Sequence, residues 1–354
     1  MVGPTLPAIF IDGRRIAADA EPYIIAELSA NHGGDLERAK RIIRMAAERG
    51  AHAIKFQAYT ADEMTLDSDR PDFVVQADNP WKGERLHALY TRAATPYEWF
   101  PELFATARAH GITPFASPFG LAGVEILKAL DAPAYKIASF EAVDLDLIAA
   151  CARTGRPMIL SVGMCTIAEI EEAVAAFRAA GGRELALLRC NSAYPADPRE
   201  ANLATIPDMA ARFGIPIGYS DHTLDAIQAA VAVSLGACIV EKHVIDAREP
   251  PTADSMFSSL PEQLEELVTV CRAAWQARGS VSYGAHARES QSLVFRRSLY
   301  ACRRIEAGEP LTDDNVRCVR PAHGLKPKHK AEVMGRKAGR AIEAGEPITW
   351  DALA

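Results

Sequence analysis

Between residues 23 and 279, short apolar or β-branched runs alternate with longer segments in which apolar residues recur at helical spacing. The short runs lack the polar alternation of exposed strands, as expected for parallel strands that are covered on both faces. Each run therefore predicts a buried strand. The predicted strands are Tyr23–Leu28, Ala53–Gln57, Thr113–Ser117, Ala134–Ser139, Pro157–Gly163, Leu185–Asn191, Ile215–His222 and Cys238–Val244.

The segment from Asp35 to Arg49 carries a clear helical pattern of apolar residues. Asp35 is a suitable N-cap, and Gly50 is a suitable residue to end the helix. About eight strand-then-helix units in roughly 250 residues predict an α/β fold, a (β/α)8 TIM barrel, with an open doubly wound sheet as the main alternative. The other predicted helices are Glu98–His110, Val124–Leu130, Thr166–Ala180 and Leu260–Arg278.

Two segments precede or interrupt this alternation. Residues 1–22 contain an Asp12-Gly13 pair between apolar stretches, which predicts an N-terminal β-hairpin on the floor of the barrel. Residues 61–95 form a long polar insertion that includes the sequence Trp81-Lys82-Gly83. Because connections of this length usually serve a function, we expect a lid or a partner contact there.

The pattern changes after Gly279, where residues 280–291 are typical of a polar linker. Residues 292–354 contain an internal repeat, with IEAGEPLT at 305–312 and IEAGEPIT at 342–349. Two copies of one glycine-turn unit predict a small, pseudo-symmetric β-rich module. We therefore expect one domain over residues 1–279 and an appended domain over residues 292–354.

Composition narrows the class of protein. The chain has 39 Lys and Arg against 46 Asp and Glu, a net charge of −7 without a basic patch, which argues against nucleic-acid and anionic-membrane partners. No apolar run reaches the ~18 residues of a membrane span, and the N-terminus lacks the apolar core of a signal peptide. The seven cysteines are widely spaced without C-x-x-C pairs, which suits reduced thiols. We expect a cytoplasmic protein.

Polar residues recur where the predicted strands end, although the interior of a parallel strand should be apolar. The carboxyl ends of the strands form the face of a TIM barrel that carries active sites, so these residues predict a catalytic mouth. They include Glu27, Asn31, Lys55, Gln57, Ser117, Lys136, Ser139, Glu141, Asn191, Ser192, Tyr194, Ser220, His222, Glu241 and His243.

Residues two apart in a strand share a face, so Ser220 and His222 point together, as do Glu241 and His243. Two imidazoles on neighbouring strands, with a position left for water or substrate, suit a catalytic divalent metal. The alternative is a pair of buried, hydrogen-bonded structural histidines.

Lys55 and Lys136, with hydroxyls from Ser117, Ser139 and Ser220, predict a pocket for a phosphate or carboxylate anion. The alternatives are surface lysines with extended stems or a Schiff-base role for Lys136. Three glutamates would serve as general acids or bases or would hold sugar hydroxyls. These glutamates are Glu27, Glu141 and Glu241.

The same stretches resemble the sialic acid synthase family over nearly the whole chain, and they are most similar to its pseudaminic acid synthase branch. Residues 292–354 are similar to the antifreeze-like (SAF, β-clip) domain of that family. The motifs that carry the resemblance are Ala26-Glu27-Leu28-Ser29-Ala30-Asn31-His32, Ile54-Lys55-Phe56-Gln57, Lys136-Ile137-Ala138-Ser139-Phe140-Glu141, Tyr219-Ser220-Asp221-His222-Thr223, Val240-Glu241-Lys242-His243, Asp254-Ser255-Met256-Phe257-Ser258 and Val319-Arg320-Pro321.

The resemblance implies a metal-dependent condensation of phosphoenolpyruvate with 2,4-diacetamido-2,4,6-trideoxy-L-altrose. It also implies a domain-swapped homodimer in which Arg320 enters the partner's barrel. His222 and His243 would hold Mn²⁺, with Mg²⁺ or Co²⁺ as alternatives. The implied catalytic residues are Glu241, Glu27, Lys55 and Lys136. The two lysines would bind phosphoenolpyruvate together with Ser117, Ser139, Ser192 and Ser220. The other implied substrate-binding residues of the barrel are Glu141, Tyr194, Asp254, Asn31 and Gln57.

Some positions depart from the family pattern and leave the choice of sugar open. They are Ser192 after Cys190-Asn191, Val162 after Ser161, and Tyr219 before Ser220. A sister synthase that uses N-acetylmannosamine or the legionaminic acid precursor is therefore the nearest alternative. A non-catalytic carbohydrate-binding protein is a more distant one.

Overall fold

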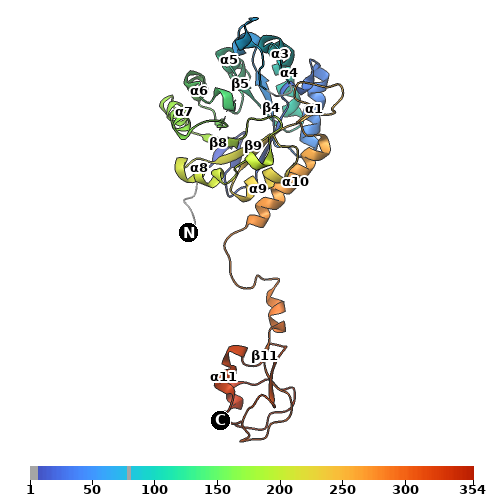
Figure 1. Ribbon diagram of the computed structural model, residues 1–354, viewed down its shortest axis with the longest axis vertical. Helices are drawn as coiled ribbons and strands as arrows, with labels where there is room; N and C mark the ends of the chain where they lie inside the picture. The colour runs from blue at the N-terminus through green and yellow to red at the C-terminus, as the bar shows by residue number, and fades with distance from the viewer. Residues whose placement is uncertain (1–6, 78–80) are drawn as a thin grey trace. The chain divides into compact units, whose positions relative to one another are not determined.

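The computed structural model describes residues 7–77 and 81–354, and the chain divides into two compact units after Gly279. In the described part of the first unit, eight parallel strands close into a barrel, and helices surround it (Figure 1). The strands are β3 (Tyr23–Glu27), β4 (Ala53–Ala58), β5 (Thr113–Pro118), β6 (Tyr135–Ile137), β7 (Met158–Ser161), β8 (Leu185–Cys190), β9 (Ile217–Asp221) and β10 (Ile239–His243).

The barrel closes where β10 pairs with β3, with His243 opposite Glu27 in the register. This pairing confirms the predicted TIM barrel and excludes an open sheet, which would leave two unpaired edges. All eight predicted strands are present, with slightly different ends. Strands β6, β7 and β9 are each three residues shorter than predicted, and at β6 the chain turns into a 3-10 helix at Ser139–Glu141.

The helices around the barrel follow local capping chemistry. Asp35 caps α1 by accepting from the backbone N–H of Glu37, and Gly50 follows the helix with φ of 86°, as the sequence predicts. Helices α6, α8 and α9 lie outside the predicted set. The barrel helices are α1 (Leu36–Glu48), α4 (Phe100–Ala109), α5 (Leu121–Ala129), α6 (Leu145–Ala152), α7 (Ile167–Ala179), α8 (Thr205–Phe213), α9 (Ile227–Ser234) and α10 (Pro261–Arg278).

The N-terminal hairpin packs on the apolar residues inside the barrel. Strands β1 (Ile9–Ile11) and β2 (Arg14–Ile16) turn at Asp12 and Gly13, which both have positive φ as a tight hairpin turn requires. Ile9, Ile11 and Ile16 join one buried cluster with inward residues of the strands. The hairpin therefore closes the end of the barrel opposite the mouth.

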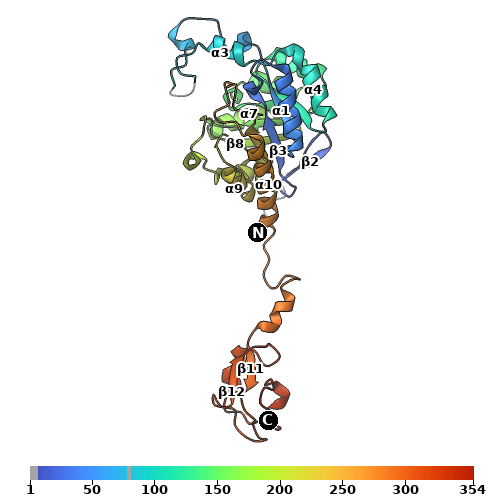
Figure 2. The same cartoon turned by 90° about the vertical axis from the view of Figure 1, so that its right-hand side faces the viewer.

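The insertion at residues 61–95 contains α2 (Ala61–Met64), a 3-10 turn at Pro71–Phe73 and α3 (Leu86–Ala93), and its residues 78–80 lie outside the described part. In Figure 2, α3 and the chain near it stand away from the ring of helices. No helix in the described residues is both long and apolar enough to cross a membrane.

The second unit, residues 280–354, has its own small core. Strands β11 (Ser298–Ala301) and β12 (Val316–Val319) pair antiparallel, and a short helix, α11, spans Lys330–Val333. The two repeats meet at a bridge between Ile305 and Ile342, which are both fully buried. The internal repeat of the sequence thus forms the centre of this unit.

Candidate active site

Each barrel strand carries a buried polar or thiol side chain at or near its carboxyl end. Asp221, which follows Ser220 in β9, and Lys242, which follows Glu241 in β10, point away from the barrel interior. Lys242 Nζ lies 2.7 Å from Asp221 Oδ2 in a buried ion pair. That pair is therefore outside the mouth. The inward side chains are Glu27, Lys55, Ser117, Lys136, Ser161, Cys190, Ser220 and Glu241.

Two lysines and two glutamates form a buried cluster at the centre of the mouth. Lys55 Nζ lies 2.5 Å from Glu27 Oε2 and 3.8 Å from Glu241 Oε2. Lys136 Nζ lies 3.4 Å from Glu241 Oε1, which also accepts from the Ser220 hydroxyl at 3.1 Å. The sequence predicted that both lysines bind an anionic ligand. In the structure, each of them already forms an ion pair with a glutamate carboxylate.

Burial and ion pairing separate the pKa values of the two glutamates. Burial raises the pKa of Glu27 to about 7, although the charge of Lys55 opposes this shift. Burial also disfavours ionised Glu241, but Lys136 and Lys55 outweigh it and lower the pKa of Glu241. Burial lowers the pKa of Lys136. The cluster therefore keeps Glu241 as an anion and lets Glu27 exchange a proton near neutral pH.

The hydroxyl of Ser117 contacts this cluster, and those of Ser139 and Ser192 lie around Gly163. Ser117 Oγ accepts from Lys55 Nζ at 3.2 Å, and Ser139 Oγ accepts from the backbone N–H of Gly163 at 3.1 Å. A Cβ on Gly163 would lie 2.6 Å from Ser192 Oγ and 2.9 Å from Ser139 Oγ. Gly163 therefore leaves the space that the two hydroxyls occupy, a role that the sequence did not indicate.

His222 and His243 meet at the same mouth, with ring centroids 5.5 Å apart. His222 Nδ1 lies 2.7 Å from the carbonyl oxygen of Asn191, which makes Nδ1 the donor; in the neutral ring the lone pair is then on Nε2. Burial disfavours a charge on this ring, but Cys190 and the Asn191 carbonyl outweigh it and raise the pKa of His222. His243 Nδ1 is buried without a hydrogen-bond partner in the described part of the chain. Burial, together with His222, holds the pKa of His243 well below its usual value, so its imidazole is neutral.

These features fit a metal ligand pair. A neutral imidazole with a free nitrogen is the form that binds a divalent ion, and a carbonyl on the other nitrogen orients the ring. Among residues 7–77 and 81–354, no group of three or more His, Cys, Asp or Glu side chains is arranged to hold a metal ion.

Asp254 reaches the mouth from the loop after β10. Its Oδ2 accepts from the Ser29 hydroxyl and from the backbone N–H of Ala30, and it lies 3.9 Å from His243 Nδ1. Burial raises the pKa of Asp254. The loop thus places a carboxyl group next to the histidine pair.

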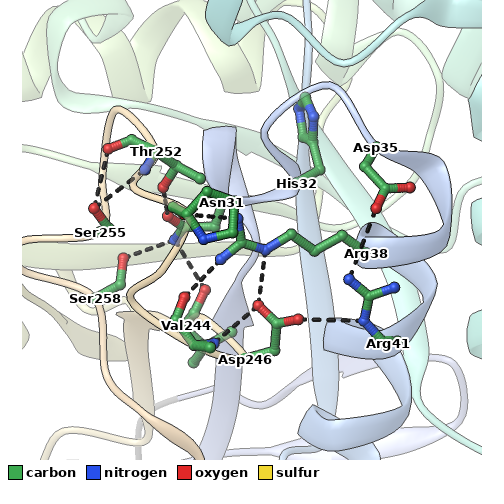
Figure 3. A network of polar contacts seen from close by, with 12 residues as sticks. Asn31, His32, Asp35, Arg38, Arg41, Val244, Asp246, Thr252, Ser255 and Ser258 are labelled. Carbon is green, nitrogen blue, oxygen red and sulfur yellow. Dashed lines mark hydrogen bonds and ion pairs between the residues drawn. The ribbon is translucent and has the colours of Figure 1, made fainter.

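A polar network connects that loop to the segment after β3 (Figure 3). Asn31 Nδ2 donates to the Val244 carbonyl and the Ser258 hydroxyl, and Asn31 Oδ1 accepts from the Thr252 hydroxyl. Arg38 is buried and donates to Asp246 Oδ1 at 2.8 Å. The amide of Asn31 thus ties the loop after β10 to the segment after β3.

The structure brings nearly all the predicted site residues to one mouth. Gln57 lies two residues beyond Lys55 in β4, opposite Ser117, and Glu141 lies in the turn after β6. Burial raises the pKa of Glu141 to about 7. Tyr194 packs against His222, with ring centroids 4.2 Å apart. Arg320 belongs to the second unit and is described there alone.

Comparisons with known proteins agree with this arrangement. The model of the NeuB family matches residues 42–283, and that of the SAF domain matches residues 296–354. The chain is 40% identical over 324 residues to a pseudaminic acid synthase of Campylobacter jejuni, covering 92% of this chain and 94% of the relative. It is 39% identical over 331 residues to the pseudaminic acid synthase of Helicobacter pylori, covering 93% and 97%.

A solved structure shares the fold. An N-acetylneuraminic acid synthetase from Leptospira borgpetersenii, crystallised with citrate, superposes with a TM-score of 0.73 at 31% identity, covering 82% of this chain and 96% of that one. The resemblance to the sialic acid synthases is confirmed. The chain belongs to the NeuB family and carries a C-terminal SAF domain.

Proposed function

We propose that this protein is a pseudaminic acid synthase, which condenses phosphoenolpyruvate with 2,4-diacetamido-2,4,6-trideoxy-L-altrose to give pseudaminic acid and phosphate. The observation that carries the proposal is the buried lysine–glutamate cluster beside the histidine pair. It offers cations for an anionic substrate, proton-exchanging carboxyls and two imidazoles within one barrel mouth. The names of the two pseudaminic acid synthases described above support the choice of sugar.

Lys55 and Lys136 would bind the phosphate and carboxylate of phosphoenolpyruvate, with the surrounding hydroxyls as further donors. An incoming anion competes with the carboxylates that these lysines contact in the free protein. Glu27 has the raised pKa, so its protonation relieves that competition most easily. The pairing of lysines and glutamates is thus compatible with anion binding.

His222 and His243 would hold a divalent cation, which we propose to be Mn²⁺, with Mg²⁺ or Co²⁺ as alternatives. When bound, it would polarise the carbonyl oxygen of the open-chain sugar. In the reaction, C3 of phosphoenolpyruvate bonds to C1 of the sugar, water adds to C2, and the C–O bond to phosphate breaks. Glu241 would accept the proton of that water, and protonated Glu27 would supply one to the sugar oxygen.

Phosphate release from phosphoenolpyruvate tests this proposal. The assay offers the altrose-derived sugar, its legionaminic counterpart or N-acetylmannosamine, each with Mn²⁺ and with EDTA. We expect release with the altrose-derived sugar that EDTA abolishes. Release with another sugar alone would identify a sister synthase, and no release with any sugar would favour a carbohydrate-binding protein.

Replacing a histidine tests the metal site. We expect His243→Ala to lower kcat/KM by more than about 100-fold, beyond the loss usual for outer-shell ligand partners. His110→Ala, at an exposed helix end, is the matched control. Full turnover by His243→Ala would contradict the assignment. A pyruvate adduct trapped on Lys136 by borohydride would instead indicate Schiff-base chemistry.

We also propose a cytoplasmic homodimer in which Arg320 completes the partner's site. The seven cysteines are free in the structure, which suits a reducing compartment. Light scattering measures the assembly, and a monomer in solution would contradict it. Mixing Arg320→Ala protein with His243→Ala protein tests whether the subunits exchange their second units. If they do, a mixed dimer has one intact site, formed by His243 of one subunit and Arg320 of the other, and activity returns.

A further inference from the structure

The insertion at residues 61–95 reaches the mouth of the barrel through Trp81. The indole N–H of Trp81 donates to the carbonyl of Ala253 at 3.1 Å, in the loop after β10. The Trp81 ring contacts Tyr194 and Phe257 edge-on, with centroids 6.1 and 6.2 Å away. The end of the insertion is also tied down, since the Thr95 hydroxyl lies 3.2 Å from His32 Nε2.

The same rings extend to the histidine pair. Tyr194 packs 4.2 Å from His222 and 5.0 Å from Phe257, measured between ring centroids. Phe257 in turn lies 5.1 Å from His243. We call Trp81, Tyr194 and Phe257 the aromatic wall. It gives the mouth an apolar side next to the histidines, in contrast to the charged side formed by the lysine–glutamate cluster.

The two sides suit different parts of the reactants. Phosphoenolpyruvate is an anion and belongs at the lysines, while the sugar carbonyl belongs near the histidines. An extended six-carbon chain is about 6 Å long. This length exceeds the 4.2 Å between the Tyr194 and His222 ring centroids and the 5.1 Å between those of Phe257 and His243.

The sugars under comparison differ in their apolar groups at that end. The altrose-derived sugar has a methyl group at C6 and an acetamido group at C4, where N-acetylmannosamine has hydroxyls. Aromatic side chains favour methyl groups, and burial of an unpaired hydroxyl is unfavourable. An aromatic wall therefore discriminates between the two sugars.

We propose that Trp81 is a specificity-determining residue, which receives the 6-methyl and acetamido end of a 2,4-diacetamido-2,4,6-trideoxy sugar. This inference rests on the proposed function. It also gives the insertion a role, because the insertion places Trp81 against Tyr194 and Phe257. Both of these residues lie more than one hundred positions away from Trp81 along the chain.

Steady-state kinetics of Trp81→Ala test the proposal. We expect KM for the altrose-derived sugar to rise about tenfold or more, the range for loss of an apolar contact, while KM for phosphoenolpyruvate stays within about twofold. The affinity for N-acetylmannosamine should change by less than about threefold. It is measured as KM if this sugar is turned over, and otherwise as an inhibition constant. Trp81→Phe keeps a ring but loses the bond to Ala253, so it should have a smaller effect.

Trp275→Ala is the matched control, since Trp275 packs on the outside of the barrel from α10. Equal losses for both sugars in Trp81→Ala, or an unchanged KM for the altrose-derived sugar, would overturn the role of Trp81. If Trp81→Ala does not fold, the same comparison in Trp81→Phe decides. Absence of turnover by the parent protein with every sugar would instead refute the proposed function.

Discussion

Arg38 provides a test of the network in Figure 3 that does not depend on the reaction. Its side chain is 5% exposed and donates to Asp246 Oδ1 at 2.8 Å, to the Pro250 carbonyl at 3.0 Å and to the Ala247 carbonyl at 2.6 Å. Arg38→Met keeps the length of the stem and removes all three hydrogen bonds.

The expected loss follows from these contacts. Breaking a buried ion pair by removing one partner costs about 3–5 kcal/mol. Asp246 is 20% exposed, and residues 247–250 are exposed, so water replaces part of what is lost. We therefore expect a loss near the lower limit, about 3 kcal/mol, which lowers the melting temperature of a unit this size by about 6–12 °C.

Arg41→Met is the matched control on the same helix. Arg41 also contacts Asp246, at 3.4 Å, but its side chain is 49% exposed. Surface ion pairs contribute about 0–1 kcal/mol, so this variant should melt close to the parent protein. Thermal unfolding followed by circular dichroism measures both variants. Equal melting temperatures for Arg38→Met and Arg41→Met would refute the assigned importance of the buried network.

Two further predictions concern the mouth. Gly163→Ala should lower kcat/KM for phosphoenolpyruvate by about 10- to 100-fold, because its Cβ displaces the Ser139 and Ser192 hydroxyls. Unchanged kinetics would mean that these hydroxyls do not contact substrate. Burial raises the pKa of Glu141 from its ordinary 4.5 to about 7, so folded Glu141 holds a proton that the unfolded chain has released, and stability falls as the pH rises through this interval. Glu141→Gln should therefore melt higher than the parent protein at about pH 8 and nearly equally at about pH 4.5, and a gain of the same size at both values would contradict the raised pKa.

The amino-acid sequence determined the succession of strands and helices and the position of the polar residues at the strand ends. Both are local features: they follow from the spacing of apolar residues and from capping residues such as Asp35. Strand periodicity also predicted that Glu241 and His243 point together. The prediction that His222 meets His243 needed only the neighbouring positions of two strands in a closed barrel.

The tertiary structure alone decided how these side chains pair. The ion pairs of Lys55 with two glutamates depend on barrel closure and on side-chain conformations, which no local pattern encodes. Likewise, the amide of Asn31 holds a loop more than two hundred residues away, a contact that the sequence did not indicate. Trp81 reaches Ala253 across 172 positions of the chain. Contacts at such separations are set by the packing of the whole barrel and its loops, because only that packing brings the distant segments together.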